Sequence, residues 1–156
     1  MTQLHSNPIN APHDDVDTIV AVMVSGSAAA AAAPFVVGWP LFIGALCTGV
    51  IAIGEEYGTS LDSKEEAWKV IRNLFAAAGF IWLALSVSSK LIAALLQTSG
   101  IGYVGAVALD VVTSSAIAYA VGRGAQAYFK GERDKERLGA IFRQSFMHQK
   151  QQSAGA

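Results

Sequence analysis

The chain carries no charged residue between Thr18 and Gly54, and this long apolar run limits what it can fold into. Residues 34–40, with the sequence PFVVGWP, interrupt the run with two prolines, and proline ends or kinks a helix. The run therefore predicts two apolar helices of about 15 residues each. We expect them to fold back on each other as a helical hairpin over residues 17–57. The residues expected at its tip are Pro34, Trp39 and Pro40.

The composition has the same apolar bias. Hydrophobic residues make up 53% of the 156 residues and charged residues only 15%, whereas soluble domains average about 25% charged residues. A chain with so few charges either buries its apolar faces very efficiently or has lipid as part of its solvent. Its net charge of −1 argues against nucleic acid as a partner.

Sequence motifs for catalysis and metal binding are missing. The single cysteine, Cys47, permits neither an internal disulfide nor a cysteine-based zinc site, and His5, His13 and His148 are scattered along the chain. The sequence contains neither a P-loop nor a G-x-S-x-G motif. We therefore predict no catalytic residue, no cofactor and no metal site, and we do not expect an enzyme.

A second helical hairpin is predicted over residues 63–130. Ser63 followed by Glu66 is typical of a capping box, which begins a helix. This helix becomes apolar and is expected to continue over about residues 73–97. The returning helix is predicted over residues 103–129. The expected class is therefore all-α, with four apolar helices in two antiparallel hairpins followed by a C-terminal amphipathic helix.

Glycines mark the expected ends of these helices. Gly58 is predicted to end the first hairpin, and Gly131 the second. Residues 100–105, GIGYVG, have the spacing of a dinucleotide fingerprint, but no strand precedes them and no acidic residue follows about 20 positions later. Gly100 and Gly102 are instead expected to form the tight turn at the tip of the second hairpin.

The second hairpin is expected to contain a ladder of polar residues. Lys90 and Asp110 lie equally far from the predicted turn, and Ser86 and Ser114 lie one helical turn further along. We predict an ion pair between Lys90 and Asp110, flanked by Ser86, Thr113 and Ser114. Such a pair would fix the register of the hairpin. Two alternatives remain open: a polar track for ions, or side chains that point apart, with Lys90 reaching toward the tip.

A basic amphipathic helix is predicted over residues 132–150. Its apolar residues recur at helical spacing on one face and its basic residues lie on the other. The apolar stripe consists of Leu138, Ile141, Phe142 and Phe146, and the basic face includes Arg137 and Arg143. One interpretation places this helix on the inner surface of a membrane, with its basic face toward anionic lipid. The other packs it on the helical bundle or on a partner.

The remaining segments flank this core. Residues 1–16 are predicted to be a flexible tail, with the first helix of the 17–131 domain capped at Asp17 or Thr18. Residues 151–156 are predicted to be a second tail. The small-residue tract 25–33, SGSAAAAAA, favours close helix packing, either within one chain or between copies in a homo-oligomer.

Two stretches of the sequence carry a resemblance to a known family. They are EEYGTSLDSKEEAWKVI at residues 55–71 and GIGYVGAVALDVVTSSAIAYAVGRGAQAYFKG at residues 100–131. They are similar to the linker and the glycine-rich second hairpin of a bacterial domain of unknown function that accompanies Era-like small GTPase domains. The resemblance implies a non-catalytic, membrane-associated helical module that works with a separate small GTPase.

Helix length and charge placement favour a membrane location. A helix needs about 20 apolar residues to cross a hydrocarbon core of about 30 Å, so the second hairpin could span while the shorter first one could enter one leaflet or cover the second. Both tips are uncharged, and the positive-inside rule places the charged side, with both termini, in the cytoplasm of a bacterial inner membrane. We expect a module that anchors, adapts or remodels the bilayer. The alternatives are a soluble interaction bundle and an oligomeric channel built on the Lys90–Asp110 ladder.

Overall fold

The computed structural model describes residues 12–79 and 103–155, and every regular element in these two ranges is an α-helix. The prediction of an all-α chain is therefore confirmed for this part of the protein. The helices are α1 (Pro12–Ala32), α2 (Phe35–Glu56), α3 (Lys64–Ala78), α5 (Tyr103–Phe129) and α6 (Lys135–Ala154). Residues 80–102, which include Ser86, Lys90, Gly100 and Gly102, lie outside the described residues, so the two-hairpin arrangement as a whole is not confirmed.

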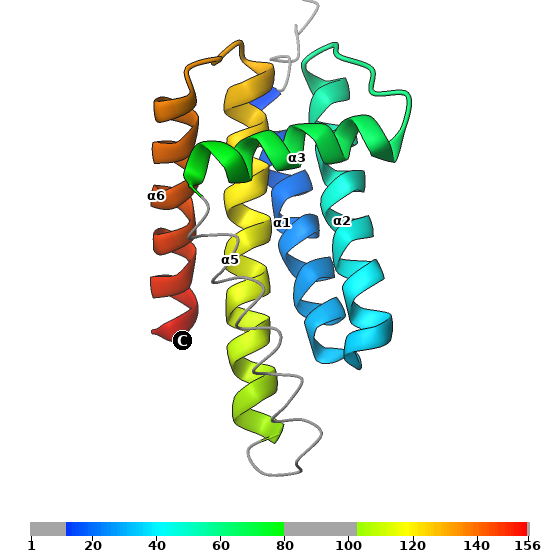
Figure 1. Cartoon of the computed structure of the whole chain (residues 1–156), viewed down its shortest axis with the longest axis vertical. Coiled ribbons are helices and arrows are strands. Elements are labelled where there is room, and N and C mark those ends of the chain that lie inside the picture. The colour runs from blue at the N-terminus through cyan, green and yellow to red at the C-terminus, as the bar shows by residue number, and fades with distance from the viewer. Residues whose placement is uncertain (1–11, 80–102, 156) are drawn as a thin grey trace, which may run out of the picture.

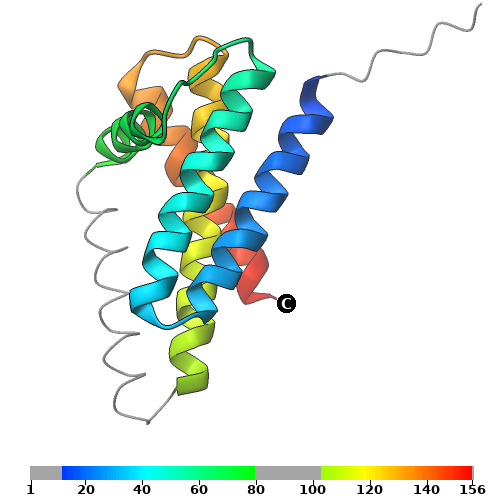
Figure 2. The same ribbon diagram turned by 90° about the vertical axis from the view of Figure 1, so that its right-hand side faces the viewer.

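Helix α5 is the centre of the bundle and packs against each of the other four described helices. In Figure 1, α6, α5, α1 and α2 run along the long axis of the molecule, while α3 lies across their upper half. Helices α2 and α5 run upward in this view, and α1 and α6 run downward. Figure 2 shows α1 and α2 diverging from their connection at the lower end, so that the two helices form a V.

The break between α1 and α2 is shorter than the sequence predicts. Only Ala33 and Pro34 separate the two helices, and Pro34 adopts an extended conformation (φ −54°, ψ 142°) whose carbonyl accepts hydrogen bonds from the amides of Val37 and Gly38. Proline is well suited to the start of a helix because it has no amide hydrogen to satisfy. Trp39 and Pro40 therefore lie within α2, and the prediction that they belong to the tip is wrong.

This shorter break lengthens both arms. Helices α1 and α2 contain 21 and 22 residues, which gives each a length of about 32 Å at about 1.5 Å per residue. The predicted arms of about 15 residues would be only about 23 Å long. The argument that the first pair is too short to cross a membrane is therefore wrong.

Several predicted helix boundaries are confirmed. The hydroxyl of Ser63 accepts a hydrogen bond from the Glu66 amide at the start of α3. The Glu66 carboxylate accepts a hydrogen bond from the amide of Asp62. In the usual capping box the donor is the amide of the N-cap residue itself, which here is Ser63. Gly58 (φ +71°) and Gly131 (φ +105°) follow α2 and α5 in the left-handed conformation that ends a helix.

Other boundaries differ from the prediction. Helix α3 ends at Ala78, with Gly79 at φ +100° as its cap, whereas the sequence predicts that this helix continues to about residue 97. Helix α1 begins at Pro12, so Asp17 and Thr18 lie inside it and are not its caps, and residues 12–16 are not a tail. Helix α6 likewise extends through residues 151–154, where the sequence predicts a tail.

Small residues bring the helix backbones close together. A Cβ atom at Gly38 in α2 would overlap the carbonyl oxygen of Ala30 in α1, and a Cβ at Gly139 in α6 would overlap the carbonyl of Ala77 in α3. Glycine is therefore required at both crossings, because any side chain would push the two helices apart. The contact at Ala30 also places the small-residue tract in packing within the chain.

Candidate functional site

The connection between α1 and α2 and the neighbouring start of α5 form an apolar end of the molecule, which we define as residues 29–41 and 107–109. It contains no charged residue and lies at the bottom of the bundle in Figure 1. The large apolar side chains that are exposed here are Val36 (83%), Val37 (54%), Trp39 (37%), Leu41 (55%) and Leu109 (45%). Water-exposed apolar groups concentrated in this way mark a surface that contacts lipid or protein.

The polar helix α6 ends beside the lowest turns of α1 and α2 and above the first turns of α5. The rings of His148 on α6 and Tyr119 on α5 stack 6.2 Å apart, which fixes the register of the two antiparallel helices. In this register, the last residues of α6 lie level with about residue 113 of α5. The start of α5 therefore projects beyond the charged and amide side chains of α6.

The opposite, charged end of the bundle is tied together by a polar network. Arg123 on α5 donates to Asp17 on α1 at 2.6 Å and to Gln126 at 3.2 Å, and Gln126 donates to the hydroxyl of Tyr57 at 3.3 Å. Burial lowers the pKa of Arg123, but its contacts with Tyr119 and Asp17 outweigh burial and raise that pKa above its ordinary value. The network joins α1, α2 and α5 where the bundle meets water.

Helices α1 and α2 are both long and apolar enough to cross a membrane, by length and composition alone. The two qualifying segments are Asp15–Ala32 and Val36–Glu56, and only 33% and 39% of them, respectively, are buried inside the protein. Core helices of water-soluble proteins pass the same test, but they are mostly buried. The exposure of these helices therefore gives weak evidence for membrane association.

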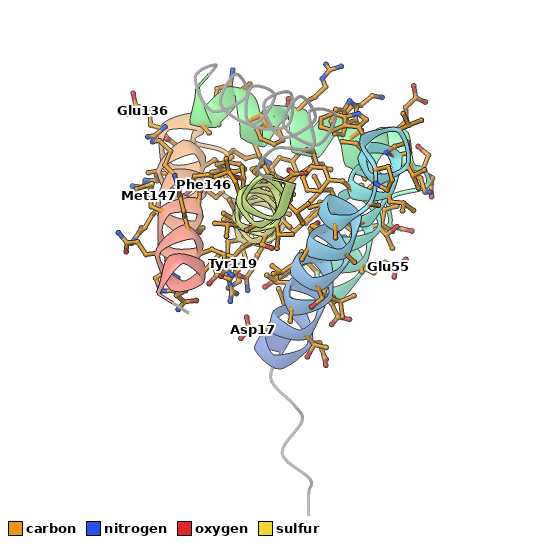
Figure 3. All side chains as sticks on the ribbon, turned by 90° about the horizontal axis from the view of Figure 1, so that it is seen from below. Asp17, Glu55, Tyr119, Glu136, Phe146 and Met147 are labelled. Carbon is orange, nitrogen blue, oxygen red and sulfur yellow. The ribbon has the colours of Figure 1, made fainter. Side chains whose placement is uncertain are left out.

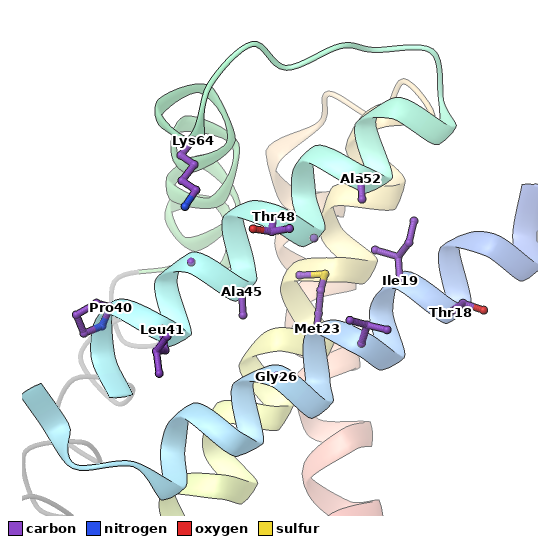
Figure 4. A pocket seen from close by; sticks show the side chains of 13 residues that line it. Thr18, Ile19, Met23, Gly26, Pro40, Leu41, Ala45, Thr48, Ala52 and Lys64 are labelled. Carbon is purple, nitrogen blue, oxygen red and sulfur yellow. The ribbon is translucent and has the colours of Figure 1, made fainter. Parts of the chain in front are cut away.

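A groove of about 540 Å³ runs between the diverging helices α1 and α2. In Figure 4, Ala45 and Ala52 of α2 point toward α1, and Met23 of α1 points toward α2. Lys64, the first residue of α3, contributes the charged group of the groove. The described residues that line it are Thr18, Ile19, Val22, Met23, Gly26, Pro40, Leu41, Gly44, Ala45, Thr48, Gly49, Ala52 and Lys64.

The described half of the predicted polar ladder lies in the core on α5. Asp110, Thr113 and Ser114 are buried, and the Ser114 hydroxyl donates to the Asp110 carboxylate at 3.2 Å. The predicted partners Lys90 and Ser86 lie outside the described residues, so the ion pair stays a prediction. Ser27 on α1 is also fully buried, and its hydroxyl has no hydrogen-bond partner in the structure.

The apolar stripe of α6 packs on the bundle. Leu138, Phe142 and Phe146 are buried, and Phe142 lies against Phe75 of α3 with ring centroids 5.3 Å apart. Figure 3 shows Phe146 directed from α6 toward α5, while Met147 lies on the outer side. Ile141 is half-buried. The stripe of α6 is therefore covered by α5 and α3, as the interpretation that packs this helix on the bundle expects. The contact of its basic face with anionic lipid stays a prediction.

The two basic residues singled out on α6 have different surroundings. Arg143 donates to the carbonyl of Ala78 at 3.1 Å and so binds the C-terminus of α3. Arg137 is largely exposed and lies 3.6 Å from Glu132. Arg143 therefore joins two helices, whereas Arg137 forms a surface ion pair of the kind that contributes little to stability.

The sequence predicts neither the groove nor the role of Lys64 in it. The groove exists because α1 and α2 diverge, and this angle depends on how both pack against α5. From the sequence alone, Lys64 is predicted only to be one of several charged residues at the start of a helix. The sequence signal for the groove is the pair of small residues Gly44 and Ala45 on α2, which leaves space beside the helix.

No protein-family model, curated protein sequence or solved structure matches the chain.

Proposed function

We propose that the protein is a non-catalytic, membrane-associated helical module whose apolar end enters one leaflet of the bilayer. The observation that carries this proposal is the concentration of exposed Val36, Val37, Leu41 and Leu109 in a part of the surface without charges. Water is a poor solvent for such an end, whereas the hydrocarbon of a bilayer accepts it without loss of any buried contact.

The expected membrane affinity is moderate. Complete burial of one large aliphatic side chain contributes about 1.5 to 3 kcal/mol, and these side chains are already partly buried. Together they are worth on the order of 5 kcal/mol, similar to a single myristoyl chain, which binds membranes reversibly with a constant of about 10⁴ M⁻¹. The module is therefore a reversible anchor or adaptor.

The charged end remains in water in this arrangement. Glu55, Glu56, Lys130 and the Asp17–Arg123 pair all lie at the end opposite the apolar one. If the membrane is a bacterial inner membrane, the positive-inside rule places this end in the cytoplasm. A separate small GTPase, proposed from the two stretches that resemble the GTPase-associated family, would bind here.

A vesicle-binding experiment tests the proposal. Val36→Asp puts a carboxylate on the most exposed side chain of the apolar end, without disturbing the core, and should weaken binding to liposomes at least about tenfold. Met147→Asp is the matched control, because Met147 is an exposed apolar residue (45%) on α6, away from this end. Equal binding by the two variants would contradict the proposal.

The second candidate function is a soluble interaction bundle. It is favoured by the coverage of the α6 stripe, which leaves that helix with no free apolar face. In this case, the apolar end would bind a protein, and the unmodified chain would remain in the supernatant when it is centrifuged with liposomes.

A further inference from the structure

We propose that the groove between α1 and α2 holds an acyl chain of an anionic phospholipid, with the lipid phosphate at Lys64 and Thr48. The inference rests on the proposed function, and it names the class of lipid that the inserted module selects.

The shape of the groove suits a flexible hydrocarbon chain. Its sides are mostly aliphatic: Ile19 on α1 lies opposite Ala52 on α2, and Leu41 lies at the other end of the groove. Small residues, among them Gly44, leave space between these side chains. All the walls are helical, so their backbone groups are already bonded within the helices and offer no partners to an extended peptide.

The charge of the groove suits an anionic head group. Among the described residues that line it, Lys64 is the only charged one. In the part of the chain that the structure describes, the Lys64 ammonium forms no ion pair. Figure 4 shows Lys64 extending from the start of α3 toward α2, on the side to which the Thr48 hydroxyl points. An ammonium and a hydroxyl offer donors to a phosphate oxygen, and no carboxylate in the lining opposes a negative charge.

The length of the groove matches one phospholipid. Thr48 lies 14 residues after Pro34, which corresponds to about 21 Å along α2 at about 1.5 Å per residue. Half of a bilayer, including its head groups, is about 20 to 22 Å thick. A phospholipid whose phosphate lies at Lys64 and Thr48 is therefore long enough for its acyl chain to follow the groove toward Leu41.

Two variants separate the head-group site from the acyl site. Lys64→Gln removes the charge at an exposed position. Gly44→Leu places a large side chain in the groove, at a position where an added Cβ meets nothing within 4 Å. Their controls are Lys69→Gln, which neutralises another exposed lysine on α3, and Ala140→Leu, which adds the same bulk to the exposed face of α6.

The test measures lipid immobilisation on the full-length protein in phosphatidylcholine vesicles containing a trace of spin-labelled phosphatidylglycerol or phosphatidylcholine. The unmodified chain should immobilise phosphatidylglycerol about fivefold more strongly, as expected for one lysine near an anionic lipid. Lys64→Gln should abolish this preference, and Gly44→Leu should reduce immobilisation of both lipids, while the two controls behave like the unmodified chain. Vesicle binding, measured in parallel by sedimentation, should change little in any variant.

The outcomes distinguish this inference from the proposed function. If the protein sediments with vesicles but shows no preference for phosphatidylglycerol, or if Gly44→Leu has no effect, the groove does not hold an anionic lipid and the membrane function stands. If the unmodified chain does not bind vesicles at all, both proposals are wrong. A loss of vesicle binding in Gly44→Leu alone, with its helical circular dichroism unchanged, would make the groove part of the inserting surface and would overturn its assignment as a site for one lipid.

Discussion

The guanidinium of Arg143 donates a hydrogen bond of 3.1 Å to the main-chain carbonyl of Ala78, so a side chain of α6 satisfies the last turn of α3. The carbonyls at the end of a helix have no partners within the helix, and a cation there also interacts favourably with the helix dipole. This contact joins the transverse helix α3 to the bundle.

We predict that Arg143→Met lowers the free energy of unfolding by about 1 to 2 kcal/mol, because it removes a charged hydrogen bond to a half-buried carbonyl. Arg137→Met removes an exposed ion pair from the same helix and should change that free energy by less than about 0.5 kcal/mol. Urea unfolding followed by circular dichroism measures both. Equal effects would show that the Arg143–Ala78 contact contributes nothing specific.

Gly139→Ala should destabilise the protein by about 2 kcal/mol or more, because the new methyl group would overlap the Ala77 carbonyl and separate α6 from α3. Gly44→Ala makes the same change in open space within a helix, where alanine is favoured over glycine by about 1 kcal/mol. Thermal or urea unfolding should therefore show opposite signs for the two substitutions. Stabilisation by both would mean that α6 and α3 do not cross closely at Gly139.

Ser27→Ala should stabilise the fold by about 1 kcal/mol, since it removes a buried hydroxyl that has no hydrogen-bond partner in the structure. Ser25 is the control, because it is exposed and its hydroxyl bonds to the Ala21 carbonyl of its own helix. Ser25→Ala should change stability by no more than about 0.5 kcal/mol. Destabilisation by Ser27→Ala would reveal a partner for this hydroxyl.

Asp110→Asn should destabilise the fold by about 2 kcal/mol or more, if Lys90 is the partner of this carboxylate, because the substitution leaves a buried ammonium unpaired. The double change Lys90→Met, Asp110→Leu replaces both charges with apolar groups and should cost less than the single change. The free energies of unfolding of the two variants test whether Lys90 and Asp110 form an ion pair. A silent Asp110→Asn would show that the pair does not form.

Local signals in the sequence predict much of the fold. The start of α3 follows from Ser63 and Glu66, and the ends of α2 and α5 follow from Gly58 and Gly131. Each of these signals acts within one helical turn, on backbone groups that no other part of the chain satisfies. These helix boundaries can therefore be predicted without knowledge of the tertiary structure.

Features that depend on packing are not predictable in the same way. The segment beginning at Pro34 has the composition of a loop, yet Trp39 and Pro40 are helical because tertiary contacts of α2 compensate for the proline. The stripe of α6 has the same pattern whether it faces lipid or protein, and only the position of α5 and α3 shows that Phe142 and Phe146 are covered. The groove depends on the angle between two helices, which no short motif encodes.

The most direct test of membrane insertion by the apolar end places an environment-sensitive fluorophore at either end of the bundle. The dye would be attached to Val36→Cys or, as control, to Lys130→Cys at the charged end, each with Cys47→Ala so that one thiol remains. On addition of liposomes, the dye at position 36 should become brighter, shift to shorter wavelength and be quenched by brominated acyl chains, while the dye at position 130 should not change. An unchanged dye at position 36 in the presence of excess liposomes would contradict insertion of the apolar end.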